Sequence, residues 1–167
     1  MSKKNETPEV TPVPDVADNN APNPIFVIEK IYLKDASLEV PHAPMIFTQR
    51  DTPEISVQLN NQSEPLENGL FHVTLQVNVR AKIQDKTLFM VELVQAGVFR
   101  IQNIPTNDVT VLLNVSCPNI LFPYAREAIS SEVTRAGFPP VVLNPVSFEA
   151  LYQQRLQQID NSSSTLQ

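Results

Sequence analysis

The stretch Phe71-His72-Val73-Thr74-Leu75-Gln76-Val77-Asn78-Val79-Arg80-Ala81-Lys82-Ile83 decides the fold of this chain. Apolar residues occupy every second position from Phe71 to Ile83, and polar residues occupy the positions between them. Because successive side chains of a strand point to opposite faces, this pattern predicts a long antiparallel strand with one wet face. The apolar face must be covered by another layer of the same fold.

Segments on both sides of this stretch also have strand patterns. Residues 54–60 alternate strictly, so Ile55, Val57 and Leu59 share one face, and a polar loop is expected over residues 61–69. Asp85 and Lys86 predict a tight turn into a returning strand over residues 87–100, with a bulge at Gly97.

The first strand is expected to begin after Pro24. Both of its faces are apolar as far as Ile28, which favours burial on both sides at the start of the strand. Residues 35–44 contain two prolines and predict an irregular loop after it. These segments together predict a four-stranded antiparallel meander.

The rest of the chain predicts helices that cover the sheet. Asn107 or Asp108 can cap a short helix that ends before Pro118, and the main helix is expected over residues 119–136, stopped by Gly137 and Pro139. Ser147 can cap a last helix that reaches Ile159. The predicted class is α+β, with helices packed on one face of the sheet.

The two ends have compositions unsuited to a core. Residues 1–24 carry five of the 15 prolines with scattered Asn and acidic residues, and residues 160–167 are mostly polar. Such segments bury too little apolar area to offset their ordering entropy. We therefore expect one domain over residues 25–159 between two disordered tails.

Charge and composition exclude several functions. The chain has 12 Lys and Arg against 18 Asp and Glu, a net charge of −6 that argues against nucleic acid or an anionic membrane as partner. With one Cys, two His and three Gly, the sequence offers no disulfide framework, zinc cluster or phosphate-binding loop, and it has no Gly-x-Ser-x-Gly motif. We expect a cytoplasmic protein that is not an enzyme and needs no metal or cofactor. Cys117 is expected to be a small buried hydrophobe.

The start of the main helix has an unusual sequence, Cys117-Pro118-Asn119-Ile120-Leu121-Phe122-Pro123-Tyr124-Ala125-Arg126-Glu127. Its two prolines predict an irregular, kinked entry, and Ile120, Leu121 and Ile129 are expected to face a partner surface.

This motif resembles the protein-export chaperones of the SecB type. Three further blocks also resemble that family, over residues 31–41, 89–99 and 138–151. The resemblance runs in order over residues 25–159. It implies a cytoplasmic homotetramer, a dimer of dimers, that holds export precursors unfolded without ATP and delivers them to the translocation ATPase SecA. It also implies that the helix after Arg126 packs against copies of itself.

The resemblance assigns two sets of site residues. The residues expected to bind the zinc-bearing C-terminal tail of SecA are Asp35, Glu39, Met90 and Glu92. Those expected to bind unfolded clients are Pro41, Phe47, Ile55, Val57, Leu59, Tyr124 and Tyr152. From pattern alone, each acid is an ordinary surface carboxylate and the strand triplet is ordinary core.

The sequence departs from the family pattern at two of these positions and at Asp51, in the loop before the second strand. Met90 stands where Leu is usual, Tyr152 where Phe is common, and Asp51 where many relatives carry Trp. The last change weakens an aromatic subsite or shifts recognition toward Phe47 and the tyrosines.

Three alternatives remain open from the sequence. One is a relative specialised for a toxin–antitoxin pair, which need not keep the acids Asp35, Glu39 and Glu92. Another is an unrelated oligomeric binding domain, and the third is a small-molecule enzyme on the same scaffold, for which the usual catalytic residue types are scarce.

Overall fold

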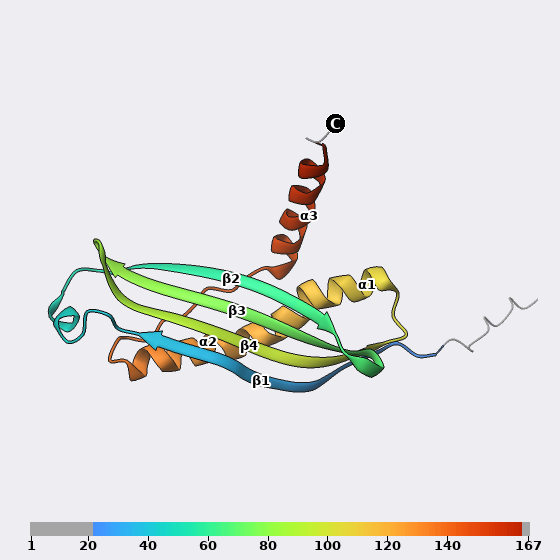
Figure 1. The fold of residues 1–167 in the computed structure, drawn as a ribbon, viewed down its shortest axis with the longest axis horizontal. Coiled ribbons are helices and arrows are strands. Elements are labelled where there is room, and N and C mark those ends of the chain that lie inside the picture. Colours follow the sequence, from blue (N-terminus) through green and yellow to red (C-terminus); the bar gives the residue numbers. More distant parts are fainter. Residues whose placement is uncertain (1–21, 165–167) are drawn as a thin grey trace, which may run out of the picture.

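The computed structural model of the protein describes residues 22–164. Four strands form one antiparallel sheet, and a long helical segment lies across one of its faces (Figure 1). The strands are β1 (Ile25–Glu39), β2 (Glu54–Pro65), β3 (Leu70–Ile83) and β4 (Lys86–Gln102). The predicted class, a four-stranded antiparallel sheet with helix on one face, is confirmed.

The strand order differs from the predicted meander. It is β1-β4-β3-β2, so β2, β3 and β4 follow one another but β1 pairs with β4. Residues 40–53, which include a 3₁₀ turn at Met45–Thr48, carry the chain from β1 past one end of the sheet to β2 (Figure 1). This connection is too long for a hairpin, and the resulting order is that of a Greek key.

Two strands extend further than their composition suggests. β1 continues through Asp35 to Glu39, where a loop was predicted, and β2 continues through Asn61 to Pro65. The turn between β3 and β4 is formed by Gln84 and Asp85, one residue earlier than predicted. Each extension is paired with a neighbouring strand, and this ladder outweighs the local preference for a loop.

The start of β1 is exposed, in contrast to the predicted burial. The exposed fractions are 36% for Phe26, 47% for Val27 and 44% for Ile28. β1 is an edge strand, and the helix layer contacts mainly the central strands β3 and β4. Apolar side chains therefore remain at this edge of the isolated chain.

The helix layer begins with α1 (Thr106–Val111), continues through a π-helical turn (Leu112–Ser116) and ends with α2 (Cys117–Arg135). Pro105 is the N-cap, so the predicted cap at Asn107 or Asp108 is wrong, as is the predicted break before Pro118. The expected irregularity is present as the π turn, and the residue four positions before Pro118 lies within it. The wider π-helical turn accommodates the ring of Pro118, which would clash with the preceding turn of a regular α-helix. α2 ends as predicted, before Gly137 at φ +89°.

The inner face of α2 forms the core with the chain's own sheet. The side chains of Leu121, Ala125, Ile129 and Val133 are completely buried, as is Cys117. The surface that Leu121 and Ile129 were expected to face is therefore the sheet of the same chain.

Gly97 allows α2 to approach the sheet closely. It pairs regularly with Ile31 and with Val73, so the predicted bulge at this position is wrong. A Cβ atom at Gly97 would lie 2.7 Å from Cε2 of Phe99 and 3.1 Å from Cδ2 of Leu121. A side chain here would force the Phe99 ring to shift and would crowd Leu121 of α2.

α3 (Phe148–Ser164) projects away from the sheet (Figure 1). The Oγ of Ser147 accepts a hydrogen bond from the backbone N–H of Ala150 at 3.2 Å, which confirms the predicted cap. The tails were expected at residues 1–24 and 160–167, but α3 continues through Ser164, so the second boundary is wrong. The remaining parts of the expected tails, residues 1–21 and 165–167, lie outside the described residues. None of the helices within residues 22–164 is both long and apolar enough to cross a bilayer.

Candidate functional site

The sheet face opposite α2, here called the outer face, carries the four residues expected to bind SecA. Asp35 pairs with Val94, and Glu39 pairs with Met90. Glu92 pairs with Ser37 between them. Directly opposed residues share a face, so all four belong to one patch on neighbouring strands β1 and β4. The three acids are exposed and Met90 is half-buried.

Met90 and Glu92 also line a hollow of about 340 Å³ on this face. β2 and β3 contribute polar side chains to it, namely Ser56, Gln58, Asn78 and Arg80. Arg80 pairs with Met90, and Asn78 pairs with Glu92. The sequence placed Asn78 and Arg80 on a wet strand face, but only the strand register brings them beside the acids.

A chain of hydrogen bonds crosses the outer face at His72. Nε2 of His72 lies 2.9 Å from the Tyr32 hydroxyl, and Nδ1 lies 2.7 Å from Oε1 of Glu64. With hydrogen on Nδ1, the neutral ring donates to Glu64 and accepts from Tyr32. The rings of Tyr32 and His72 also stack at 6.1 Å. His72, for which the sequence suggested no role, thus links β1, β3 and β2.

The helix-side face carries the apolar residues of β2. Ile55, Val57 and Leu59 pair with Ala81, Val79 and Val77, whose side chains are buried. Ile55 and Val57 nevertheless remain 45% and 43% exposed, because β2 is an edge strand with few contacts to the helix layer. The interpretation of this triplet as ordinary core is therefore wrong for Ile55 and Val57, while Leu59 does pack against the core.

Leu59 and Tyr152 line the same small hollow between β2 and the start of α3, with Asn61, Phe148 and Leu151. The Nδ2 of Asn61 donates to the carbonyl of Leu113 at 3.2 Å, and its buried Oδ1 has no partner in the described part of the chain. The structure thus adds Tyr152 to one end of the β2 triplet, so four of the seven expected client residues lie along one surface.

The other expected client residues lie elsewhere. Phe47 packs on Phe138 with ring centroids 5.2 Å apart, and Phe138 packs on Phe89 at 5.0 Å. Pro41 is exposed in the same connection as Phe47, and Tyr124 is 51% exposed on α2. None of these three lines the hollow beside Tyr152. Phe138 was missed in the sequence because it follows the helix with no periodic pattern.

Cys117 is completely buried in the helix layer. Burial raises the pKa of its thiol to about 12, because the thiolate would lose its hydration. The prediction of a buried hydrophobe is confirmed, and a neutral thiol of this kind is a poor nucleophile.

Comparison with known proteins shows what this sheet and its surfaces are similar to. The sequence profile of the preprotein translocase subunit SecB family matches residues 19–159. The chain belongs to the SecB family. This is a family of chaperones and not of enzymes.

Curated SecB proteins resemble the chain over most of its length. The protein-export protein SecB of Methylobacillus flagellatus is 58% identical over 135 residues, which cover 81% of this chain and 86% of that protein. The protein-export protein SecB of Chromobacterium violaceum is 58% identical over 138 residues, covering 82% and 92%. That of Nitrosospira multiformis is 55% identical over 141 residues, covering 84% and 89%.

A solved SecB-like structure has the same fold. It is the Mycobacterium tuberculosis SecB-like chaperone in complex with a peptide from the HigA1 antitoxin. The TM-score is 0.57 at 20% sequence identity, over 72% of this chain and 90% of that one. At this identity, the similarity concerns the fold alone.

Proposed function

We propose that this SecB family chain is an ATP-independent holdase that binds unfolded precursor proteins in the cytoplasm and delivers them to SecA. The observation that carries the proposal is the separation of two surfaces on one sheet. The helix-side face of β2 exposes apolar side chains, and the outer face of β1 and β4 exposes carboxylates. One protein can then hold a client and dock on a carrier at the same time.

The client surface follows from what an unfolded chain offers, which is apolar side chains and unpaired backbone groups. Ile55, Val57 and Leu59 supply apolar contacts, and β2 is an edge strand with backbone groups free for pairing along one side. Tyr152 extends this surface at α3, while Pro41, Phe47 and Tyr124 would add separate contacts. Many weak contacts on one scaffold give affinity without selecting one sequence.

The docking surface is proposed to consist of Asp35, Glu39, Met90 and Glu92. Three exposed acids steer a basic partner and fix its orientation, and Met90 adds an apolar contact. The partner is the zinc-bearing C-terminal tail of SecA. A chaperone restricted to a toxin–antitoxin pair would not need these acids, which favours the export role.

We further propose that the chain assembles as a homotetramer, a dimer of dimers. The exposed Phe26, Val27 and Ile28 at the edge strand β1 support one contact between copies. The side of α2 turned away from the sheet is expected to supply the other, with the long helices between two sheets. Ser130, Ser131 and Thr134 on that side are small enough for close approach of another helix.

Suppression of aggregation tests the holdase function. Purified protein should prevent aggregation of an unfolded export precursor at near-stoichiometric amounts without nucleotide, as followed by light scattering. Failure to bind any unfolded chain would overturn the proposal.

Charge reversal tests the docking surface. Asp35→Lys and Glu92→Lys should weaken binding of the SecA tail peptide in calorimetry and leave suppression of aggregation unchanged. Glu67→Lys, an exposed acid in the connection between β2 and β3, is the matched control. Equal loss of tail binding and client binding in the two variants would mean that these acids are structural. Native mass spectrometry with and without the tail peptide reports oligomeric state and docking together.

A further inference from the structure

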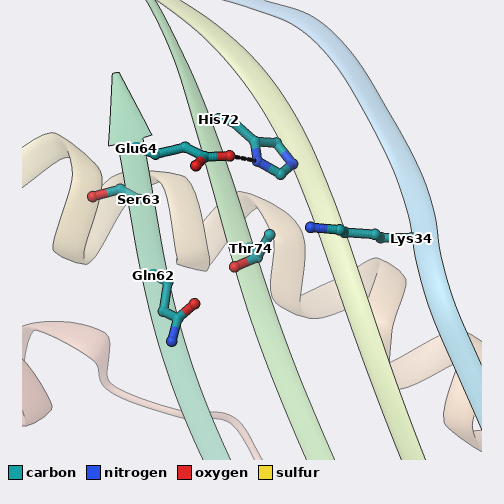
Figure 2. Close-up of a pocket in the computed structure, with 6 residues that line it drawn as sticks. All are labelled: Lys34, Gln62, Ser63, Glu64, His72 and Thr74. Atoms are coloured by element: carbon teal, nitrogen blue, oxygen red, sulfur yellow. Dashed lines mark hydrogen bonds and ion pairs between the residues drawn. The ribbon is translucent and has the colours of Figure 1, made fainter. Parts of the chain in front are cut away.

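Figure 2 shows a second hollow on the outer face, whose lining includes Lys34, the residue before Asp35 of the proposed docking surface. It has a volume of about 160 Å³ and is lined by Lys34, Gln62, Ser63, Glu64, His72 and Thr74. Pockets for small molecules span roughly 300–1,000 Å³, so this one is small for a metabolite or cofactor. A hollow of this size suits one side chain of a bound peptide.

The position of Lys34 is set by an irregularity of β1. Leu33 pairs with Gln95 and Asp35 pairs with Val94, the next residue of β4, so Lys34 is the extra residue of a bulge. Bulges redirect side chains relative to the regular ladder. Figure 2 shows the Lys34 side chain reaching from β1 across the sheet toward Thr74 and His72. The same bulge sets the register that pairs Asp35 with Val94 on the outer face.

The free polar groups of this hollow are mostly donors. In residues 22–164, no hydrogen bond or ion pair involves the side chains of Lys34, Gln62 or Thr74. They offer an ammonium group, an amide N–H and a hydroxyl. Glu64 also brings a carboxylate to this lining: its Oε1 is engaged by His72 at 2.7 Å, and its Oε2 has no hydrogen-bond or ion-pair partner within residues 22–164.

The wall of the hollow is preorganised. Hydrogen bonds to Tyr32 and Glu64 hold the ring of His72, whose side chain is only 11% exposed. The group that best complements an ammonium and two neutral donors is an anionic acceptor with two oxygens, a carboxylate.

We propose that this hollow binds a carboxylate of the peptide that docks on the outer face. The inference rests on the proposed docking of the SecA tail. Lys34 directly precedes Asp35, so a tail held by Asp35, Glu39 and Glu92 passes close to the hollow. Acids that receive its basic residues and a lysine that receives a carboxylate fix the direction in which the tail lies. The carboxylate belongs to an acidic side chain or to the C-terminus of the tail.

The test is a calorimetric cycle with the full-length protein and synthetic SecA tail peptides. In one set of peptides, each Asp is replaced by Asn and each Glu by Gln, one at a time, and in another the C-terminus is amidated. One of these changes should weaken binding to the wild type about 1.5- to fivefold, the range of an exposed ion pair. The same change should have no effect on binding to Lys34→Met, and which peptide responds identifies the source of the carboxylate.

The sign of the effect separates a local contact from overall charge. Lys34→Met makes the protein more acidic, so a general electrostatic effect would strengthen binding of a basic tail. We expect weaker binding instead. Lys30→Met, on the same strand and absent from the lining of the hollow, should keep both the affinity and the sensitivity to carboxylate removal. Thr74→Val should weaken binding about twofold with no change of charge.

The outcomes distinguish this inference from the function on which it rests. If the unmodified tail binds but Lys34→Met binds it as well as the wild type does, the carboxylate site is wrong and docking stands. The same holds if carboxylate removal affects wild type and Lys34→Met equally. If the tail does not bind the wild type, the proposed docking and this inference both fail.

Discussion

Replacing Gly97 with Ala should destabilise the protein, because the sheet leaves no room for a methyl group beneath α2. The new Cβ would lie 2.7 Å from Cε2 and 3.0 Å from Cζ of Phe99, and 3.1 Å from Cδ2 of Leu121. Phe99 and Leu121 are both 0% exposed, so neither can move into solvent. Insertion of a methyl group into a filled core costs about 1–3 kcal/mol.

A smaller effect acts in the opposite direction. Ala restricts the unfolded chain more than Gly does, which stabilises by about 0.4–1 kcal/mol where the native backbone suits Ala. Gly97 lies in a regular ladder rather than in the left-handed region, so this gain applies. The net expectation is a loss of about 1–2 kcal/mol in the free energy of unfolding.

Urea unfolding followed by circular dichroism measures this loss, at one fixed protein concentration because the proposed assembly would contribute to stability. A double-mutant cycle with Phe99→Leu isolates the contact. The cost of Gly97→Ala should fall in the Phe99→Leu background, since the smaller side chain vacates the ring position. A midpoint for Gly97→Ala at or above that of the wild type would refute the close approach of helix and sheet, and so would an unchanged cost in the Phe99→Leu background.

Three further predictions concern the client surface, the buried thiol and α3. Ile55→Ser combined with Val57→Ser should weaken client binding in the aggregation assay and change the unfolding midpoint little, because both side chains are exposed; matched loss of stability would mean that they are core. Cys117 should stay unreactive to a thiol reagent until the protein unfolds, and its pKa of about 12 should make stability fall as pH rises above about 9, where the unfolded thiol ionises. Prompt labelling of the native protein would contradict this assignment. Ser147→Ala removes the acceptor of the Ala150 N–H and should cost about 0.5–2 kcal/mol of α3 stability, seen as faster hydrogen exchange there; unchanged exchange would dismiss the cap.

Local sequence patterns predicted the strands and helix ends better than they predicted which strands pair. Alternation identified β3 almost to the residue, and Gly137 and Ser147 correctly marked helix boundaries. The pairing of β1 with β4 was missed, since it joins residues more than 50 positions apart without a local signal. The same pairing decides that Glu39 lies opposite Met90. The four residues of the proposed docking surface could be selected by resemblance to the family, but the strand register is what places them on one face.

The sequence by itself determined the family, the antiparallel strands with one apolar face, and the buried character of Cys117, because these depend on residue order and side-chain type. Only the tertiary structure decided the strand order, the exposure of Ile55 and Val57, and the hollow that Lys34 shares with His72 and Thr74. The physical reason is that strand pairing and helix coverage are settled by contacts between distant segments. Phe71–Ile83 shows both sides of this division: its alternation predicts an apolar and a wet face, but the fold decides what covers one and what gathers on the other.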